Sequence, residues 1–197
     1  MRHCCLSVEA GTTAFILKCF PSSRLIKWRK GMGKGNIVFL IGGSSAGKTT
    51  LAHSLQDKFS EPYFYLSKDI FMCDMAPENR SRSAWPDKYL VCSSLFFRTI
   101  RLFSDMAKNV VADSVRLDDA FISLLSDCPV IAVHVTCHSV EELRRREIAR
   151  GDRAIGQAER QLLEERSDAV CDMTVDTFDF TADECADKVC AYVMHRV

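Results

Sequence analysis

The sequence predicts an α/β fold of three layers, in which helices cover both faces of a five-stranded, mostly parallel sheet. Three observations support this fold class. Short apolar runs alternate five times with segments of helical periodicity. The first run, residues 36–41, is continuously apolar after Asn36, as in strands buried on both faces. The chain of 197 residues is 47% hydrophobic and 26% charged, a composition typical of a folded domain.

The first half of the chain supplies two strands and two long helices. After the strand at 36–41, a loop of glycine and serine leads into a helix that carries Leu51, Leu55 and Phe59 at helical spacing. A long amphipathic helix follows later, with an apolar stripe made of Cys92, Leu95, Phe96, Ile100 and Phe103. The expected elements are helix 48–59, strand 63–66, a polar surface excursion at 74–86 and helix 87–108.

The second half continues the alternation of strands and helices. Two helix starts have the spacing of a capping box, Ser139 with Glu142 and Thr181 with Glu184. The expected elements are strand 109–113, helix 117–125, strand 129–135, helix 139–150, helix 157–165, strand 171–175 and helix 181–194.

Residues 1–35 are expected to form an N-terminal extension outside the core, and residues 36–197 to form one domain. The extension mixes cysteine, glycine, serine and basic residues without periodicity, and Lys18 interrupts its one short apolar run, which argues against a secretory signal. Deleting residues 2–31 is therefore expected to leave activity intact.

Cysteine usage indicates a reducing, cytoplasmic compartment. The 10 cysteines have irregular spacing and form no CxxC pair. The group of His134, Cys137 and His138 resembles a metal site in spacing, but it follows an apolar run, so we interpret it as the end of a strand.

Charge and hydropathy exclude two classes of partner. Lysine plus arginine and aspartate plus glutamate both number 26, giving zero formal net charge, whereas proteins that bind nucleic acid are normally basic. No apolar run approaches the roughly 18 residues that a membrane span requires. We therefore expect neither nucleic acid nor a membrane as partner, while a homo-oligomer remains possible.

The loop after the first strand matches the phosphate-binding pattern G-x-x-x-x-G-K-[ST] in full. Glycines let backbone N–H groups surround phosphate oxygens, and the next helix directs its positive end at the same anion. Lys48 would contact the β- and γ-phosphates of ATP, and Thr49 would offer its hydroxyl to Mg²⁺. A simple turn of small residues is the alternative, and the buried strand before the loop and the helix after it argue against that. The expected nucleotide-binding residues here are Gly42, Gly43, Ser44, Ser45, Ala46, Gly47, Lys48, Thr49 and Thr50.

Absent motifs narrow the class of nucleotide-binding protein. The chain has no N-K-x-D and D-x-x-G motifs of GTPases, and no LSGGQ-like motif of transporter ATPases. A short chain with an arginine-rich segment after the fourth strand suits a small kinase with a closing lid.

Four segments together resemble the chloramphenicol phosphotransferase-like family over residues 36–197. They are FLIGGSSAGKTTL at 39–51, the turn at Asp69, EIARGDRAIG at 147–156 and CDMTVDT at 171–177. The resemblance implies a P-loop NTPase fold similar to adenylate and shikimate kinases. It also implies transfer of the γ-phosphoryl group of ATP to a hydroxyl of a small acceptor. Asp69 would be the base, Arg150 and Arg153 would be lid residues near the phosphates, and adenine would lie by the turn after the last strand.

The residues themselves support these roles less strongly. Asp69 follows the second strand, at the sheet edge where ligands of open α/β folds bind, but an aspartate there could also cap a helix. Asp113 ends the third strand and could hold Mg²⁺ through water, or it could cap a loop. Family members often have paired acids here, whereas this chain has Asp113-Ser114.

The basic residues near Gly151 also have two interpretations. A run of arginines on a helix usually forms a solvated face. Gly151 and Gly156 supply hinge freedom, however, and the planar guanidinium suits phosphate oxygens, which favours the lid role for Arg150 and Arg153.

The acceptor side departs from the resemblance. Relatives that accept chloramphenicol have a longer, glycine-rich stretch where this chain has residues 74–86, which contain no glycine. We therefore do not expect chloramphenicol as the physiological substrate. Two other functions stay open: a nucleotide-binding regulatory protein that lacks phosphotransfer, and a nucleoside or nucleotide kinase.

Overall fold

The computed structural model describes residues 33–73, 87–151, 156–164 and 171–196. The secondary-structure elements are, in chain order, β1 (Ile37–Ile41), α1 (Lys48–Lys58), β2 (Tyr63–Ser67), α2 (Lys68–Cys73), α3 (Lys88–Asp105), β3 (Asn109–Ser114), α4 (Asp119–Ile122), the 3-10 turn η2 (Ser123–Leu125), β4 (Val130–Thr136), α5 (Val140–Arg150), α6 (Gln157–Glu164), β5 (Met173–Asp176) and α7 (Ala182–Arg196).

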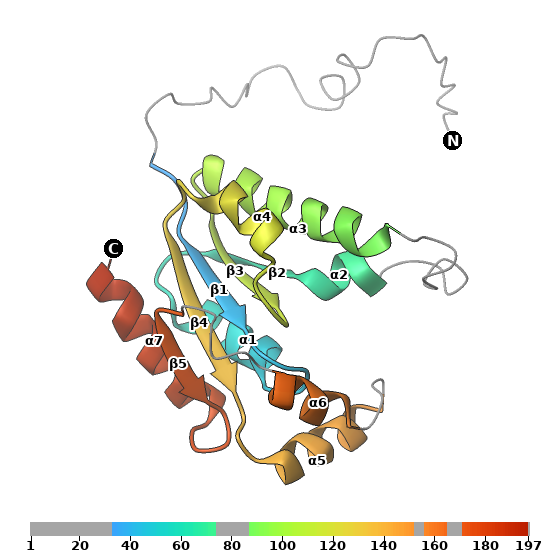
Figure 1. Cartoon of the computed structure of the whole chain (residues 1–197). Helices are drawn as coiled ribbons and strands as arrows, with labels where there is room; N and C mark the ends of the chain where they lie inside the picture. Colours follow the sequence, from blue (N-terminus) through green and yellow to red (C-terminus); the bar gives the residue numbers. More distant parts are fainter. Residues whose placement is uncertain (1–32, 74–86, 152–155, 165–170, 197) are drawn as a thin grey trace, which may run out of the picture. The chain divides into compact units, whose positions relative to one another are not determined.

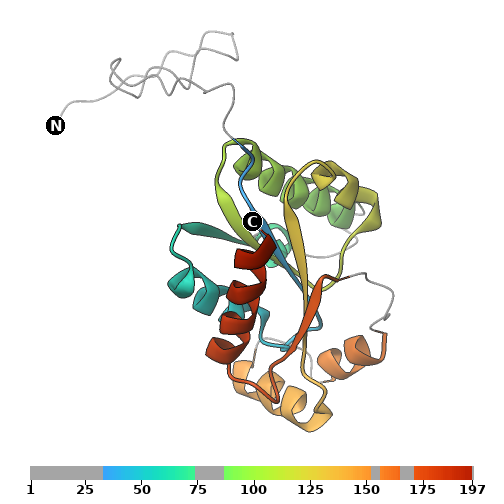
Figure 2. The same ribbon diagram turned by 90° about the vertical axis from the view of Figure 1, so that its left-hand side faces the viewer.

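The strands form one five-stranded sheet in the order β2-β3-β1-β4-β5, and every neighbouring pair is parallel. β1 lies at the centre, with Ile37 level with Val110 of β3 and Val130 of β4. Helices α1 and α7 cover one face of the sheet, while α3 and α4 lie on the other (Figures 1 and 2). The predicted three-layer α/β fold is confirmed.

The two faces of β1 supply the centres of two apolar cores, because successive side chains of a strand point to opposite faces. Val38 and Leu40 pack with α1 and α7. Phe39 points the other way and contacts the rings of Phe96 and Phe97 on α3, with centroids 5.9 and 5.7 Å away. All five residues of β1 are buried, which explains why the run has no polar positions.

The local predictions differ from the structure in three places. The short helix α2 was not expected, and the predicted helix 117–125 is divided into α4 and the turn η2. On α3, Leu95 is 48% exposed whereas Phe97 is fully buried, so the buried stripe lies slightly around the helix from the predicted one. The predicted excursion at 74–86 and residues 1–32 of the predicted extension at 1–35 lie outside the described residues.

Parallel strands end at one edge of the sheet, and this edge positions the site. The carboxyl ends of β1 and β4 point toward α5 and α6, which lie beyond that edge in Figure 1. Among the described helices, none is long and apolar enough to cross a membrane.

Candidate active site

The loop that joins β1 to α1 has a backbone conformation that phosphate binding requires. Ser45 and Gly47 both adopt positive φ angles, of 60° and 93°. A Cβ atom at Gly42 would lie 1.9 Å from the carbonyl oxygen of Val135, so only glycine fits there. Alternating backbone conformations of this kind turn successive N–H groups toward one point and create a concave anion site.

The polar groups of this loop fit a bound anion. Ser44 Oγ and Ser45 Oγ are buried and have no hydrogen-bond partner within the described part of the chain. Buried hydroxyls normally have a partner, so these two are candidates for phosphate contacts. Helix α1 begins at Lys48 with no side-chain cap and no acidic residue in its first turn. Its positive end is therefore not neutralised locally, which favours an anion at that point.

Lys48 places its ammonium group across the loop. Its Nζ donates to the carbonyl oxygens of Gly42 at 2.8 Å and Gly43 at 2.7 Å. The loop at 42–47 therefore lies between β1 and α1, and Lys48 and Thr49 begin that helix, as the sequence predicts.

An open cavity of about 530 Å³ adjoins the loop. Three segments that are distant in the sequence line it: the end of the loop with the start of α1, the inner side of α5, and the turn after β5. Arg150, a predicted lid residue, is one of the lining residues. The lining residues are Ser45, Gly47, Lys48, Thr49, Thr50, Glu142, Arg145, Arg146, Ala149, Arg150, Thr177, Phe180, Thr181 and Ala182.

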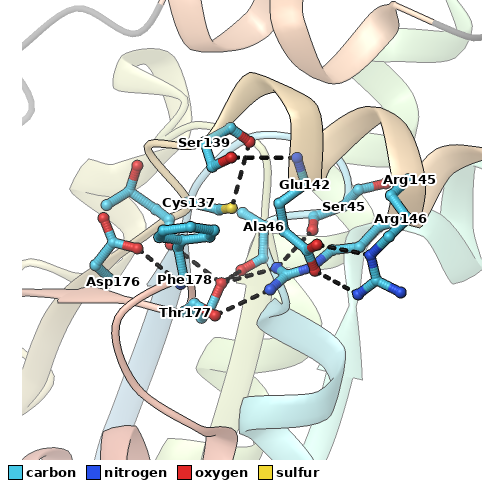
Figure 3. A network of polar contacts seen from close by, with 11 residues as sticks. Ser45, Ala46, Cys137, Ser139, Glu142, Arg145, Arg146, Asp176, Thr177 and Phe178 are labelled. Carbon is cyan, nitrogen blue, oxygen red and sulfur yellow. Dashed lines mark hydrogen bonds and ion pairs between the residues drawn. The ribbon is translucent and has the colours of Figure 1, made fainter.

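Arg146 joins α5 to the phosphate-binding loop (Figure 3). Its guanidinium donates to the carbonyl oxygen of Ser45 at 3.2 Å, to Thr177 Oγ1 at 2.9 Å and to Thr177 O at 2.9 Å. Glu142 accepts from the Nε of the same arginine at 2.8 Å. Arg146 was not singled out from the sequence, where it is one member of an arginine run. The Glu142 spacing of four residues was the only local signal, and it does not show which arginine reaches the loop.

Thr177 completes this junction from the turn after β5. Its hydroxyl contacts the carbonyl oxygens of Ala46 at 2.8 Å and Thr136 at 3.2 Å. The Thr177 hydroxyl therefore connects the turn after β5 to the loop, to the end of β4 and to α5. We infer that these contacts fix the wall of the cavity.

The guanidiniums of Arg145 and Arg146 hold the pKa of the Glu142 carboxyl at about 2, below its ordinary value of 4.5. The folded state thus binds a proton at Glu142 less readily than the unfolded chain does. The ion pairs stabilise the fold above pH 4.5, and this contribution is lost as pH falls toward 2. We expect Glu142→Gln to lower the melting temperature at pH 7, and the difference from the unaltered protein to shrink steadily below pH 4.5.

Thermal denaturation followed by circular dichroism at several pH values measures this effect. Glu141→Gln is the matched control, because Glu141 is an exposed neighbour on the same helix with no ion pair inside the described ranges. An equal and pH-independent loss of melting temperature in both variants would contradict the assignment.

Thr49 and Asp113, the two predicted Mg²⁺ ligands, lie on either side of one phenol group. The Tyr65 hydroxyl donates to Asp113 Oδ2 at 2.7 Å, and its oxygen lies 3.4 Å from Thr49 Oγ1. Asp113 is 5% exposed and belongs to β3, so it does not cap a loop. Burial, together with the adjacent Asp113 carboxylate, raises the pKa of Tyr65 to about 12. The sequence reasoning did not find Tyr65, because nothing in an apolar strand marks one tyrosine for a polar contact.

Asp69 lies in the first turn of α2, directly after β2, and is exposed. It is not the N-cap that the alternative interpretation suggested, because Ser67 Oγ accepts the Asp69 N–H at 3.3 Å. Ser67, the last residue of β2, is level with Asp113 in the sheet. Asp69 comes two residues later, so it lies at the same edge of the sheet as Asp113. Arg153, the remaining predicted catalytic residue, lies outside the described residues.

Helix α6 also contacts the phosphate-binding loop. Gln161 Oε1 accepts the Ser44 N–H at 2.6 Å. The start of this helix is fixed by Glu147, a carboxylate that is 1% exposed and accepts from the N–H groups of Gly156 at 2.7 Å and Ala158 at 2.6 Å. Helices α5 and α6 therefore each contact the loop through one side chain, Arg146 and Gln161.

A parallel sheet with a phosphate-binding loop after β1, an acidic residue on β3 and a helical segment above the loop defines the P-loop kinase fold. Solved structures agree with this class. Shikimate kinase from Acinetobacter baumannii in complex with shikimate has a TM-score of 0.61, at 17% identity, over 82% of this chain and 94% of that chain. The APS kinase CysC of Mycobacterium tuberculosis in complex with AMPPNP and APS has a TM-score of 0.60, at 15% identity, over 83% of this chain and 99% of that chain.

The chain belongs to the chloramphenicol phosphotransferase-like family, whose sequence model matches residues 35–194. A curated relative from Mycobacterium tuberculosis strain H37Rv, named "Putative O-phosphotransferase Rv2636", is 32% identical over 177 residues. The match covers 75% of this chain and 77% of the relative. The family resemblance seen in the sequence is confirmed, and with it membership of a phosphotransferase family with a kinase fold.

Proposed function

We propose that this protein is an ATP-dependent kinase that transfers the γ-phosphoryl group to a hydroxyl of a small acceptor. The observation that carries the proposal is the meeting of two parts at one sheet edge. One part is the phosphate-binding loop, whose buried serine hydroxyls have no hydrogen-bond partner among the residues that the structure describes. The other is the pair of Thr49 and Asp113, joined through Tyr65.

The nucleotide side of the site is the better supported one. The phosphates of ATP would lie on the loop at 42–49, with Lys48 against the β- and γ-phosphates. The nucleoside would occupy the part of the cavity lined by Arg146, Thr177 and Phe180. Arg150 lines the same cavity, and we assign it and Arg153 to the phosphates in the closed lid.

Thr49 and Asp113 fit Mg²⁺, which prefers oxygen ligands and retains several waters. Thr49 is exposed and Asp113 is buried, so Thr49 would hold the ion directly and Asp113 would hold it through water. When bound, the ion would neutralise charge on the phosphate oxygens and hold them in position.

In the transfer step, the acceptor oxygen attacks the γ-phosphorus in line with the bond to the β-phosphate. The new O–P bond forms as the bond to the bridging oxygen breaks, and ADP leaves. Asp69 would accept the proton of the acceptor hydroxyl, since a carboxylate at this edge can orient a hydroxyl for attack. Lys48 and Arg153 would stabilise the negative charge of the transferring group.

A panel of acceptors tests the proposal. The panel contains hydroxylated metabolites, hydroxylated antibiotics including chloramphenicol, and nucleosides with their monophosphates. ADP release is measured for each, and ATP affinity is measured separately by calorimetry. We expect ADP release above the ATPase background with at least one hydroxylated compound, and weak or no turnover of chloramphenicol.

The outcomes separate the candidate functions. ATP binding without turnover of any acceptor favours a nucleotide-binding regulatory protein. Turnover confined to nucleosides or nucleotides favours a nucleotide kinase. Failure to bind ATP would contradict the phosphate-binding role of the loop and with it the whole proposal.

A further inference from the structure

We propose that Tyr65 is a positioning residue that holds the two Mg²⁺ ligands, Thr49 and Asp113, in register with each other. The proposal rests on the proposed function, since it concerns the metal of the same site. It adds a third residue to that site, from a strand that neither supplies the loop nor carries the carboxylate.

The position of Tyr65 in the sheet makes this contact possible. Tyr65 lies on β2 level with Val111, two residues before the level of Asp113 on β3. The side of the sheet that α1 covers carries residues 63 and 65 of β2 and residue 111 of β3. Asp113 is two residues after Val111, so it lies on the same face. A tyrosine at this diagonal is long enough to reach the strand end and the first turn of α1.

The surroundings hold the Tyr65 ring in place. The ring meets the imidazole of His53 on α1 edge-on, with centroids 5.2 Å apart. It also packs against the apolar core between the sheet and α1. A ring confined in this way keeps its hydroxyl at one point, so the hydroxyl can fix the groups that it contacts.

The two contacts of the hydroxyl differ in character. Asp113 Oδ2, 2.7 Å away, belongs to a nearly buried carboxylate, so this is a short, charge-assisted hydrogen bond. Thr49 Oγ1, 3.4 Å away, belongs to an exposed residue that opens to the cavity. The phenol thus connects a buried acid to an exposed hydroxyl on a different element, and it leaves the second oxygen of Asp113 for a water or a metal.

Such an outer partner raises metal affinity by reducing the freedom of the ligands it contacts. Loss of partners of this kind typically weakens metal binding by 10- to 100-fold. Asp113 is followed by Ser114 and not by a second acid. Metal binding at this strand end would therefore depend on the orientation of one carboxylate, the one that Tyr65 contacts.

The test compares Tyr65→Phe with the matched control Tyr63→Phe. Both variants remove one phenol oxygen from the same face of β2, but no contact links Tyr63 to Thr49 or Asp113 among the described residues. Mn²⁺ is titrated in place of Mg²⁺, with a non-hydrolysable ATP analogue present, and free Mn²⁺ is read by electron paramagnetic resonance. Affinity for the analogue without metal is measured in parallel by calorimetry.

We expect Tyr65→Phe to weaken Mn²⁺ binding about 10-fold, with unchanged metal-free nucleotide affinity, and Tyr63→Phe to leave both unchanged. Unaltered or tighter Mn²⁺ binding in Tyr65→Phe would overturn the proposal. Equal weakening in both variants would also overturn it, because the effect would then come from the strand and not from the contact. Absence of nucleotide binding in the unaltered protein would instead contradict the proposed function itself.

Discussion

Lys48→Ala is expected to lower phosphoryl transfer by roughly 10²- to 10³-fold, the scale of losing one preorganised charge stabiliser. Affinity for ATP should fall as well, because the ammonium group lies across the loop on which the phosphates would rest. The protein should remain folded, since Lys48 is absent from both apolar cores. Calorimetric titration with ATP and an ADP-release assay with the best acceptor from the panel measure the two effects.

Lys58→Ala is the matched control for this experiment. Lys58 carries the same charge at the other end of the same helix, where it pairs with Asp187. We expect its removal to leave ATP affinity and turnover unchanged. If Lys48→Ala behaved like Lys58→Ala, the loop would not be the phosphate site.

Asp69→Asn is expected to reduce phosphoryl transfer by about 10²-fold or more, since asparagine preserves size but cannot accept the proton. ATP affinity should not change, because Asp69 follows β2 and does not line the nucleotide cavity. The melting temperature should also stay constant, since the side chain is exposed and Ser67, not Asp69, supplies the cap contact to α2.

The comparison requires an acceptor and uses steady-state kinetics with melting curves. Asp119→Asn serves as control, because Asp119 is an exposed aspartate in the first turn of another helix, α4. A variant Asp69→Asn with full activity would remove Asp69 from the catalytic residues. A large loss of stability with intact rate would assign it a structural role instead.

The sheet and the phosphate-binding loop could be predicted because their signals are local. A continuously apolar strand, the glycines of the loop and the lysine after them lie within 14 consecutive residues, 36–49. The capping boxes at Ser139 and Thr181 are equally local, and both first-turn contacts are present, from Glu142 N to Ser139 Oγ and from Glu184 N to Thr181 Oγ1.

The missed features depend on contacts between distant segments. Arg146 is indistinguishable from its neighbours in the run at 144–146, because its role depends on where the Thr177 turn lies. Tyr65 acquires its role only once β2 pairs with β3 and brings Asp113 close. The short helix α2 has too few residues for a periodic pattern, and its start is set by Ser67 at the end of a strand.

The central place of β1 has a consequence for how the chain folds during synthesis. Among the strands of the sheet, β1 is made first, yet its partners, β3 and β4, begin only at Asn109 and Val130. Until then the sequence IVFLI lacks both strands with which it pairs in the finished sheet, and short apolar segments of this kind associate readily with other chains. Pairings so distant in sequence also form slowly, because a long loop must close first. The central strand of the finished sheet is therefore an apolar segment that needs protection, by α1 or by a chaperone, while the rest of the chain is made.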